Sequence, residues 1–174
     1  GNAVVYGYET EKPVSENIDL NREVDLNNEI DPNTQSGDFE YEVLDDDTVS
    51  LTKYIGQGGD VVIPSKIEER DVTKIGNKAF RYCKTITSVI IPNSVISIGN
   101  EAFSVCSSME TIEIPSSVTS IGYMAFSNSA LTSIDIPNSV TSIGYNAFYG
   151  CASLTSIDVD SENVKFTSKD NILY

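Results

Sequence analysis

The chain has 174 residues, 40% of them hydrophobic, and its 26 acidic and 11 basic side chains give a formal net charge of −15. Because it contains no histidine, it lacks the base of Ser-His-Asp and Cys-His catalysis and the imidazole ligand of common zinc sites. No stretch approaches the ~20 consecutive apolar residues of a membrane-spanning helix, and the negative charge argues against a nucleic-acid partner.

Residues 1–37 form an acidic N-terminal segment with few apolar side chains. Residues 1–50 hold 14 of the 26 acidic residues, against only Lys12 and Arg22 as bases, so the negative charge is concentrated at this end. We interpret the segment as a linker or as a docked strand, in which Ala3–Tyr8 is the stretch that could pair with a sheet.

Residues 38–60 are expected to form a β-hairpin. Apolar residues alternate with acidic ones before an Asp-rich turn and resume after it, which is the period of a strand with one apolar face. These apolar residues are Phe39, Tyr41, Val43, Val49 and Leu51. A solenoid exposes core residues and unpaired backbone at its ends, so the hairpin is predicted to cap the domain that follows.

Residues 61–159 contain an internal repeat. The motif Ile-Gly-x-x-Ala-Phe occurs four times, in steps of 23, 23 and 22 residues, beginning at Ile75, Ile98, Ile121 and Ile143. Ile-Pro recurs with it, beginning at Ile63, Ile91, Ile114 and Ile136. Such joint repetition of glycine, proline and aromatic residues is typical of a solenoid in which each copy forms one turn.

Each copy is expected to contribute one short strand before its Ile-Pro, because apolar residues alternate there with polar ones. Strands separated by a full turn of chain must stack in parallel, about 4.8 Å apart. The phenylalanines of the motif then form a stacked spine, and the glycine supplies a tight bend. Five extra residues between Pro64 and Gly76, relative to Pro92 and Gly99, predict a loop on the first turn.

The full pattern, Cys-x-x-Leu-x-x-Ile-x-Ile-Pro-x-x-Val-x-x-Ile-Gly-x-x-Ala-Phe, resembles the BspA-like bacterial leucine-rich repeat. The expected fold is an α/β solenoid dominated by β-structure, a right-handed superhelix with a parallel sheet face and an N-terminal hairpin cap. The resemblance also implies a bacterial protein that is secreted or held at the cell surface and used in adhesion or interaction. It attributes neither catalysis nor a cofactor to the repeat.

The outward-facing strand residues are the candidate ligand-binding residues, with a protein or a glycan as partner. One column holds Val62, Ile90, Glu113, Asp135 and Asp158, and the column beside it holds Ser88, Thr111, Ser133 and Ser156. The three acids are either part of a solvated face or a stripe that attracts a cation or a basic surface. Glu113 and Asp135 could suggest a glycosidase pair, but their column reads as an ordinary solvated face.

Cys83, Cys106 and Cys151 occupy one column of the repeat together with Ser129. They are expected to pack as small apolar side chains with free thiols. The alternative is a disulfide between Cys83 and Cys106, which lie on adjacent turns and could be oxidised in an exporting compartment.

Two further interpretations concern the ends of the chain. Asp31–Gly37 with Glu42 weakly resembles a calcium loop, although its glycine is seventh where the sixth is required, so no metal site is predicted. Residues 160–174 begin a strand pair, read as a C-terminal cap or the next unit, that stops abruptly as in a truncated chain. Two alternatives to an interaction module remain. One is a structural spacer, and the other, suggested by the weak calcium-loop pattern, is a calcium-stabilised module.

Overall fold

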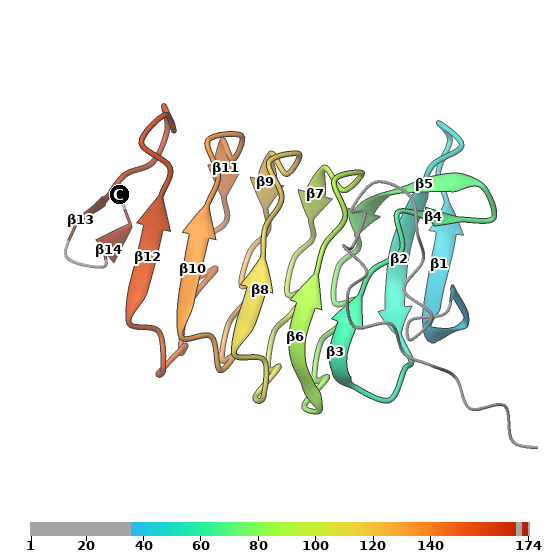
Figure 1. The fold of residues 1–174 in the computed structure, drawn as a ribbon, viewed down its shortest axis with the longest axis horizontal. Helices are drawn as coiled ribbons and strands as arrows, with labels where there is room; N and C mark the ends of the chain where they lie inside the picture. Colours follow the sequence, from blue (N-terminus) through green and yellow to red (C-terminus); the bar gives the residue numbers. More distant parts are fainter. Residues whose placement is uncertain (1–35, 170–171, 174) are drawn as a thin grey trace, which may run out of the picture.

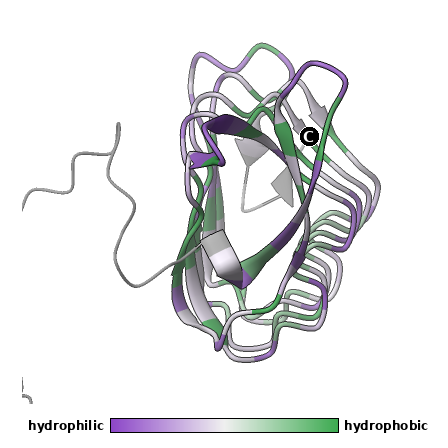
Figure 2. Ribbon diagram, turned by 90° about the vertical axis from the view of Figure 1, so that its right-hand side faces the viewer, coloured by the Kyte–Doolittle hydropathy of each residue, from purple (hydrophilic) through white to green (hydrophobic). Residues whose placement is uncertain are grey.

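The computed structural model describes residues 36–169 and 172–173. Successive turns of chain stack side by side along the long axis of the molecule (Figure 1) and, viewed along the stack, enclose a common interior (Figure 2). The predictions for Ala3–Tyr8 and for most of Asp31–Gly37 lie outside the described residues.

Each repeat contributes two strands, where the sequence predicted one. The first row is the expected sheet face: β3 (Gly59–Val62), β6 (Ile86–Ile90), β8 (Thr111–Glu113), β10 (Ser133–Ile136) and β12 (Ser156–Val159). The second row consists of β5 (Arg70–Ile75), β7 (Ser97–Ile98), β9 (Ser120–Ile121) and β11 (Ser142–Ile143), which pair in parallel behind the first (Figure 1). A strand of two residues is too short to show an alternation of apolar and polar residues, so the sequence did not predict the second row.

The fold is a β-solenoid: the predicted dominance of β-structure and the parallel sheet face are confirmed, whereas the predicted α/β class is wrong because the described residues contain almost no helix. In the described part of the chain the only helical element is the 3-10 helix η1 (Ser36–Asp38). Between the second-row strands and the next first-row strand the chain forms turns. The right-handed sense of the coil stays a prediction.

The interior is filled by the repeated apolar columns. The isoleucines of the Ile-Pro motif are 1–6% exposed. The phenylalanine spine is confirmed: ring centroids are 4.8 Å apart between Phe80 and Phe103, 5.5 Å between Phe103 and Phe126, and 5.6 Å between Phe126 and Phe148, with the rings nearly parallel. Tyr54 extends the stack at 5.2 Å from Phe80. These rings join every turn to its neighbour.

The repeated glycine is required for close approach of adjacent turns, not for an unusual backbone angle at the glycine itself. A Cβ on Gly99 would lie 2.7 Å from the backbone of the preceding turn. The bend falls two residues later, where φ is positive at every repeat: Lys78, Glu101, Met124 and Asn146. A second positive φ follows two residues after each phenylalanine, at Tyr82, Val105, Asn128 and Gly150. Each non-glycine residue in this region costs about 1 kcal/mol.

The N-terminal hairpin is present as predicted. It consists of β1 (Phe39–Val43) and β2 (Val49–Tyr54), paired antiparallel. β2 also pairs in parallel with β5, and Phe39 packs 6.1 Å from Phe80, so the hairpin lies against the first turn. Two residues of the hairpin depart from the predicted apolar face: Val43, expected on that face, is exposed, whereas Tyr54, which was not among the expected residues, is buried.

The five-residue insertion forms a second hairpin and not the predicted loop. β4 (Lys66–Ile67) pairs antiparallel with β5 through a two-residue turn. Both turn residues, Glu68 and Glu69, have positive φ, as a tight hairpin turn requires. Glutamates are unusual in such a turn, and the sequence therefore gave no signal for it. At the C-terminal end, the expected strand pair is seen as β13 (Ser168–Lys169) and β14 (Ile172–Leu173).

Candidate functional site

The first-row strands place all nine candidate residues on the outer side of the stack, exposed or half-buried. In the first sheet Val62 is aligned with Ile90 and Ile90 with Glu113, while Ser88 is aligned with Thr111. In the second sheet Asp135 is aligned with Asp158, and Ser133 with Ser156. Both predicted columns thus exist within each sheet.

The sheet face is interrupted between β8 and β10, where the sequence predicted a continuous ladder. β3, β6 and β8 form one sheet and β10 and β12 another. Glu113 and Asp135 are therefore not ladder partners, contrary to the expectation that they sit on adjacent rungs of one sheet. Just before the strands the two turns are still joined, by the hydrogen bond from the Thr132 N–H to the Glu110 carbonyl at 3.2 Å.

The interruption coincides with the single short repeat. The spacing from the core phenylalanine to the buried central residue of the next first-row strand is eight positions from Phe126 to Ile134. In the other turns this spacing is nine positions, as from Phe103 to Ile112. The missing residue lies between Ser129 and Leu131, in the turn that leads into β10. The step of 22 residues was visible in the sequence, but its effect on strand pairing was not.

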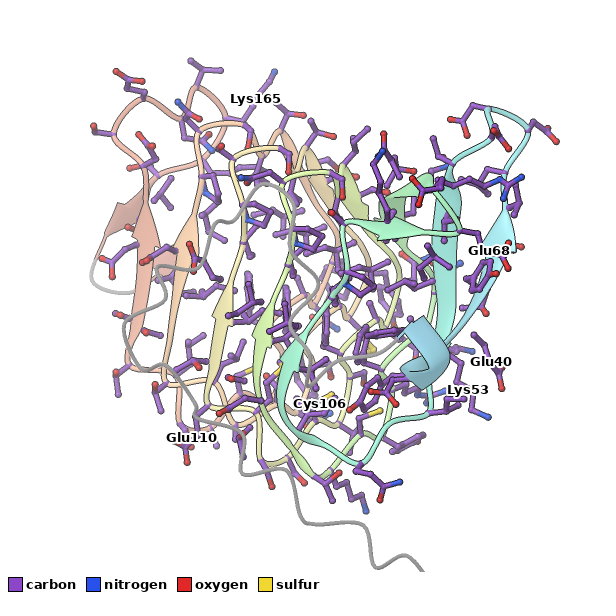
Figure 3. The ribbon with its side chains drawn as sticks, turned by 45° about the vertical axis from the view of Figure 1, so that its right-hand side comes forward. Glu40, Lys53, Glu68, Cys106, Glu110 and Lys165 are labelled. Carbon is purple, nitrogen blue, oxygen red and sulfur yellow. The ribbon has the colours of Figure 1, made fainter. Side chains whose placement is uncertain are left out.

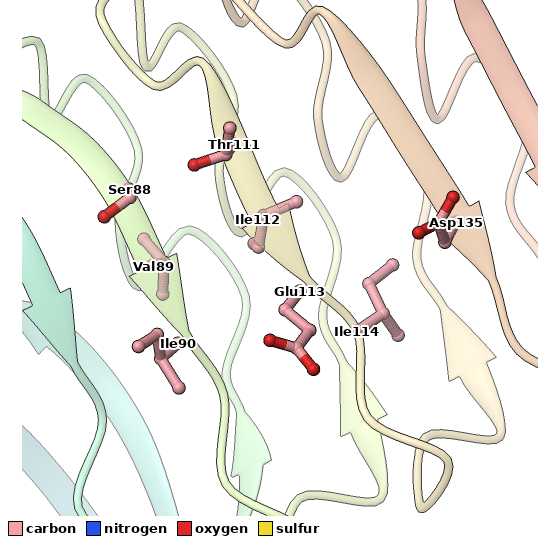
Figure 4. Close-up of a pocket in the computed structure, with 8 residues that line it drawn as sticks. All are labelled: Ser88, Val89, Ile90, Thr111, Ile112, Glu113, Ile114 and Asp135. Carbon is pink, nitrogen blue, oxygen red and sulfur yellow. The ribbon is translucent and has the colours of Figure 1, made fainter. Parts of the chain in front are cut away.

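An open depression of about 550 Å³ lies over this part of the face (Figure 4). Its lining comes from β6, β8, the residue that follows β8, and β10: Ser88, Val89, Ile90, Thr111, Ile112, Glu113, Ile114 and Asp135. Five of the nine predicted residues are thus brought together here. The four others, Val62, Ser133, Asp158 and Ser156, are outside the lining. Sequence reasoning missed Val89, Ile112 and Ile114 because they alternate inward.

The depression carries uncompensated negative charge. Residues 85–164 contain no lysine or arginine, whereas Lys53–Lys84 contains seven. Among the described residues, neither Glu113 nor Asp135 has a hydrogen-bond or ion-pair partner. Asp60 differs, because its carboxylate accepts hydrogen bonds from Ser88 at 2.6 Å and Thr87 at 2.8 Å, which lower its pKa.

The cysteines lie on the inner side of the turns, where Figure 3 shows Cys106. All three thiols are free, so the alternative of a bond between Cys83 and Cys106 is not what the structure contains. Cys106 is fully buried and donates to the Phe80 carbonyl at 3.1 Å, and burial raises its pKa to about 12. Cys83 and Cys151 are only half-buried, which departs from the expected burial.

Within the ranges 36–169 and 172–173, no group of three or more His, Cys, Asp or Glu residues could hold a metal ion. The same ranges include no helix with the length and apolar character needed to cross a membrane.

Known proteins share this architecture. A leucine-rich repeat protein from Bacteroides capillosus is 33% identical, with a TM-score of 0.66, over 73% of this chain and 97% of that one. The leucine-rich repeat protein of T. pallidum is 30% identical, with a TM-score of 0.57, over 71% and 69%. The pneumococcal vaccine antigen PcpA, 20% identical over 80% and 53% with a TM-score of 0.59, shares the fold. No curated protein matches the chain.

The repeat pattern itself has a family model. The BspA type leucine-rich repeat region matches residues 73–171 in six copies, which covers more than half of the chain. The chain belongs to the BspA-type leucine-rich repeat family.

Proposed function

We propose that this chain is a non-enzymatic interaction module of a bacterial secreted or cell-surface protein, and that it binds a protein or glycan through the first-row sheet face. The observation that supports the proposal most is the outward row of Ile90, Glu113, Asp135 and Asp158 on a stack whose turns are locked together. A rigid stack presents such a row without a cost for ordering it.

The location rests on family membership, since the BspA-like resemblance implies secretion or surface attachment. The adhesion role has the same basis. The hairpin β1–β2 is proposed as the N-terminal cap, because it pairs with β5 and buries Phe39, Val49 and Leu51 against the first turn. Without such a cap the edge of the second-row sheet would offer unpaired backbone to other chains.

Charge reversal tests the proposed binding face. The triple variant Glu113→Lys, Asp135→Lys, Asp158→Lys is compared with the wild-type chain on a panel of immobilised extracellular proteins and a glycan array. The expected result is a loss of at least about tenfold in affinity for any partner the wild type binds, as for removal of several interface charges.

The matched control carries the same charge change elsewhere. Glu42, Asp45 and Glu69 are exposed acids on the two N-terminal hairpins, so their triple Lys variant changes the net charge equally and should bind as the wild type does. Equal binding by both triple variants contradicts the proposal and favours the spacer. If the charge-reversed face unfolds, the neutral Gln/Asn triple replaces it.

A further inference from the structure

The break between β8 and β10 is a local exception in an otherwise regular stack. Every other neighbouring pair of first-row strands is joined by a parallel ladder, and this one is not. The exception coincides with a feature of the chain, the residue missing between Ser129 and Leu131. The depression of about 550 Å³ opens beside the two strands that the short repeat leaves unpaired.

We infer that this depression receives a lysine or arginine side chain of an extended polypeptide segment of a partner protein. The inference rests on the proposed function and makes it specific, since it names one place on the face and one class of partner. Its basis is the combination of a cavity, an apolar wall and two carboxylates without internal counter-charges.

The walls match the two parts of a long basic side chain. Ile90 is 40% exposed and offers apolar surface beside the nearly buried Ile112 and Ile114, against which an aliphatic stem can pack. Glu113 lies on β8 and Asp135 on β10, so each of these two turns contributes one carboxylate to the lining of the depression (Figure 4). A cationic head would thus find acceptors on two turns at once.

The charge distribution of the chain argues against two sources of the basic side chain, its own N-terminal segment and a second copy. The N-terminal segment of this chain holds eight acids and two bases in residues 1–35, and a second copy carries a net charge of −15, so both are repelled. A metal ion needs more ligands than the two carboxylates present here. An extended segment from another protein is favoured because its alternate side chains project away from the backbone and can enter an open depression on the sheet face.

The experiment uses the full chain and a defined probe. A capped heptapeptide, Thr-Val-Thr-Lys-Thr-Val-Thr, is titrated into the ¹⁵N-labelled protein at low salt, beside the same peptide with norleucine in place of lysine. The expected result is progressive amide shifts at Ile90, Glu113 and Asp135, with the lysine peptide binding at least about fivefold more tightly, which corresponds to a close exposed charge pair. Residue-specific shifts separate this site from unspecific attraction to the acidic N-terminal segment.

Two variants test the site itself. Glu113→Gln with Asp135→Asn should remove the preference for lysine over norleucine. The control, Glu42→Gln with Asp45→Asn, has the same net charge but alters exposed acids of the N-terminal hairpin, outside the lining, and should keep the preference. Equal binding of the two peptides to the wild type, or equal losses in both double variants, overturns the inference.

A third variant changes the break without changing the charge. One serine inserted between Ser129 and Ala130 gives this repeat the length of its neighbours, and should join β8 to β10 and weaken lysine-peptide binding at least about fivefold. If the folded insertion variant binds the peptide as the wild type does, the break is not the site and the inference fails. If it does not fold, the double variants still decide.

The two proposals fail differently. If partner binding depends on the charge of the face but the lysine peptide is not preferred, the inferred binding site for a basic side chain is wrong and the proposed interaction module still stands. Capture unaffected by charge reversal of the face overturns the proposed function.

Discussion

The close approach of adjacent turns at the repeated glycine predicts a large effect for Gly122→Ala. An ideal Cβ at this position lies 2.6 Å from the Asn100 N and the Gly99 carbonyl carbon, so the turns must separate by about 0.8 Å to reach ordinary contact at 3.4 Å. Two hydrogen bonds hold them at this point, from the Gly122 N–H to the Ile98 carbonyl and from the Tyr123 N–H to the Asn100 Oδ1, both 2.9 Å.

The magnitude follows from these contacts. Overpacking costs about 1–3 kcal/mol, and each weakened hydrogen bond adds up to about 1 kcal/mol. The reduced freedom of alanine in the unfolded chain returns about 0.4–1 kcal/mol. The free energy of unfolding should therefore fall by about 2–4 kcal/mol, which urea denaturation followed by circular dichroism would measure as a lower midpoint.

The matched control is Gly37→Ala, because a Cβ there meets no atom within 4 Å. Its free energy of unfolding should change by no more than about 0.5 kcal/mol, as is usual for a surface substitution. A Gly122→Ala protein as stable as this control would refute the reasoning that the glycine exists to bring the turns together.

Three further predictions follow from the interior and the turns. Phe103→Ala, in the middle of the spine, should lower the free energy of unfolding by about 3–5 kcal/mol, and by more than Phe148→Ala, since Phe103 is fully buried and Phe148 only partly; equal midpoints in urea would contradict this. The raised pKa of Cys106, about 12 against 9.0 in the unfolded chain, makes its stabilisation complete below pH 9 and lost as pH rises toward 12, with a slope of at most about 1.4 kcal/mol per pH unit. Denaturation at pH 8, 9.5 and 11 would measure this loss, and Cys106→Ala should make it smaller, although burial also raises the pKa of Cys83 and of Tyr54. An unchanged slope in that variant would assign the loss to those other groups. Asn100 accepts a hydrogen bond from the next turn, and Tyr123 occupies the equivalent position one repeat later, so Tyr123→Asn should raise the free energy of unfolding by about 0.5–1 kcal/mol. Asn100→Ala should lower it by a similar amount. If urea denaturation shows Tyr123→Asn to be destabilising and Asn100→Ala to be stabilising, the role of this asparagine column is refuted.

Much of this fold could be predicted from the repeat because its buried columns have fixed chemistry. A side chain that must fit between two identical turns meets the same space every 22–23 residues, so phenylalanine, glycine and Ile-Pro recur where Phe103, Gly99 and Ile91 stand. The first-row strands and the spine follow from that recurrence alone. The outward direction of the nine candidate residues follows from the alternation with these buried positions.

Other features depended on contacts between turns. The second-row strands are two residues long and show no period, and the bends at Lys78, Glu101 and Met124 share a backbone angle but no residue type. The hairpin at Glu68 and Glu69 lacks the usual turn residues, so only its pairing with β5 defines it.

The candidate site shows the same division. The repeat pattern alone predicts which side chains face outward, and it shows that one repeat is a residue shorter than the others. The missing ladder between β8 and β10, and the depression that Ile90, Glu113 and Asp135 line, are visible only once the turns are stacked. The physical reason is that a ladder hydrogen bond depends on the relative positions of two turns, whereas a buried column depends on the space within each turn.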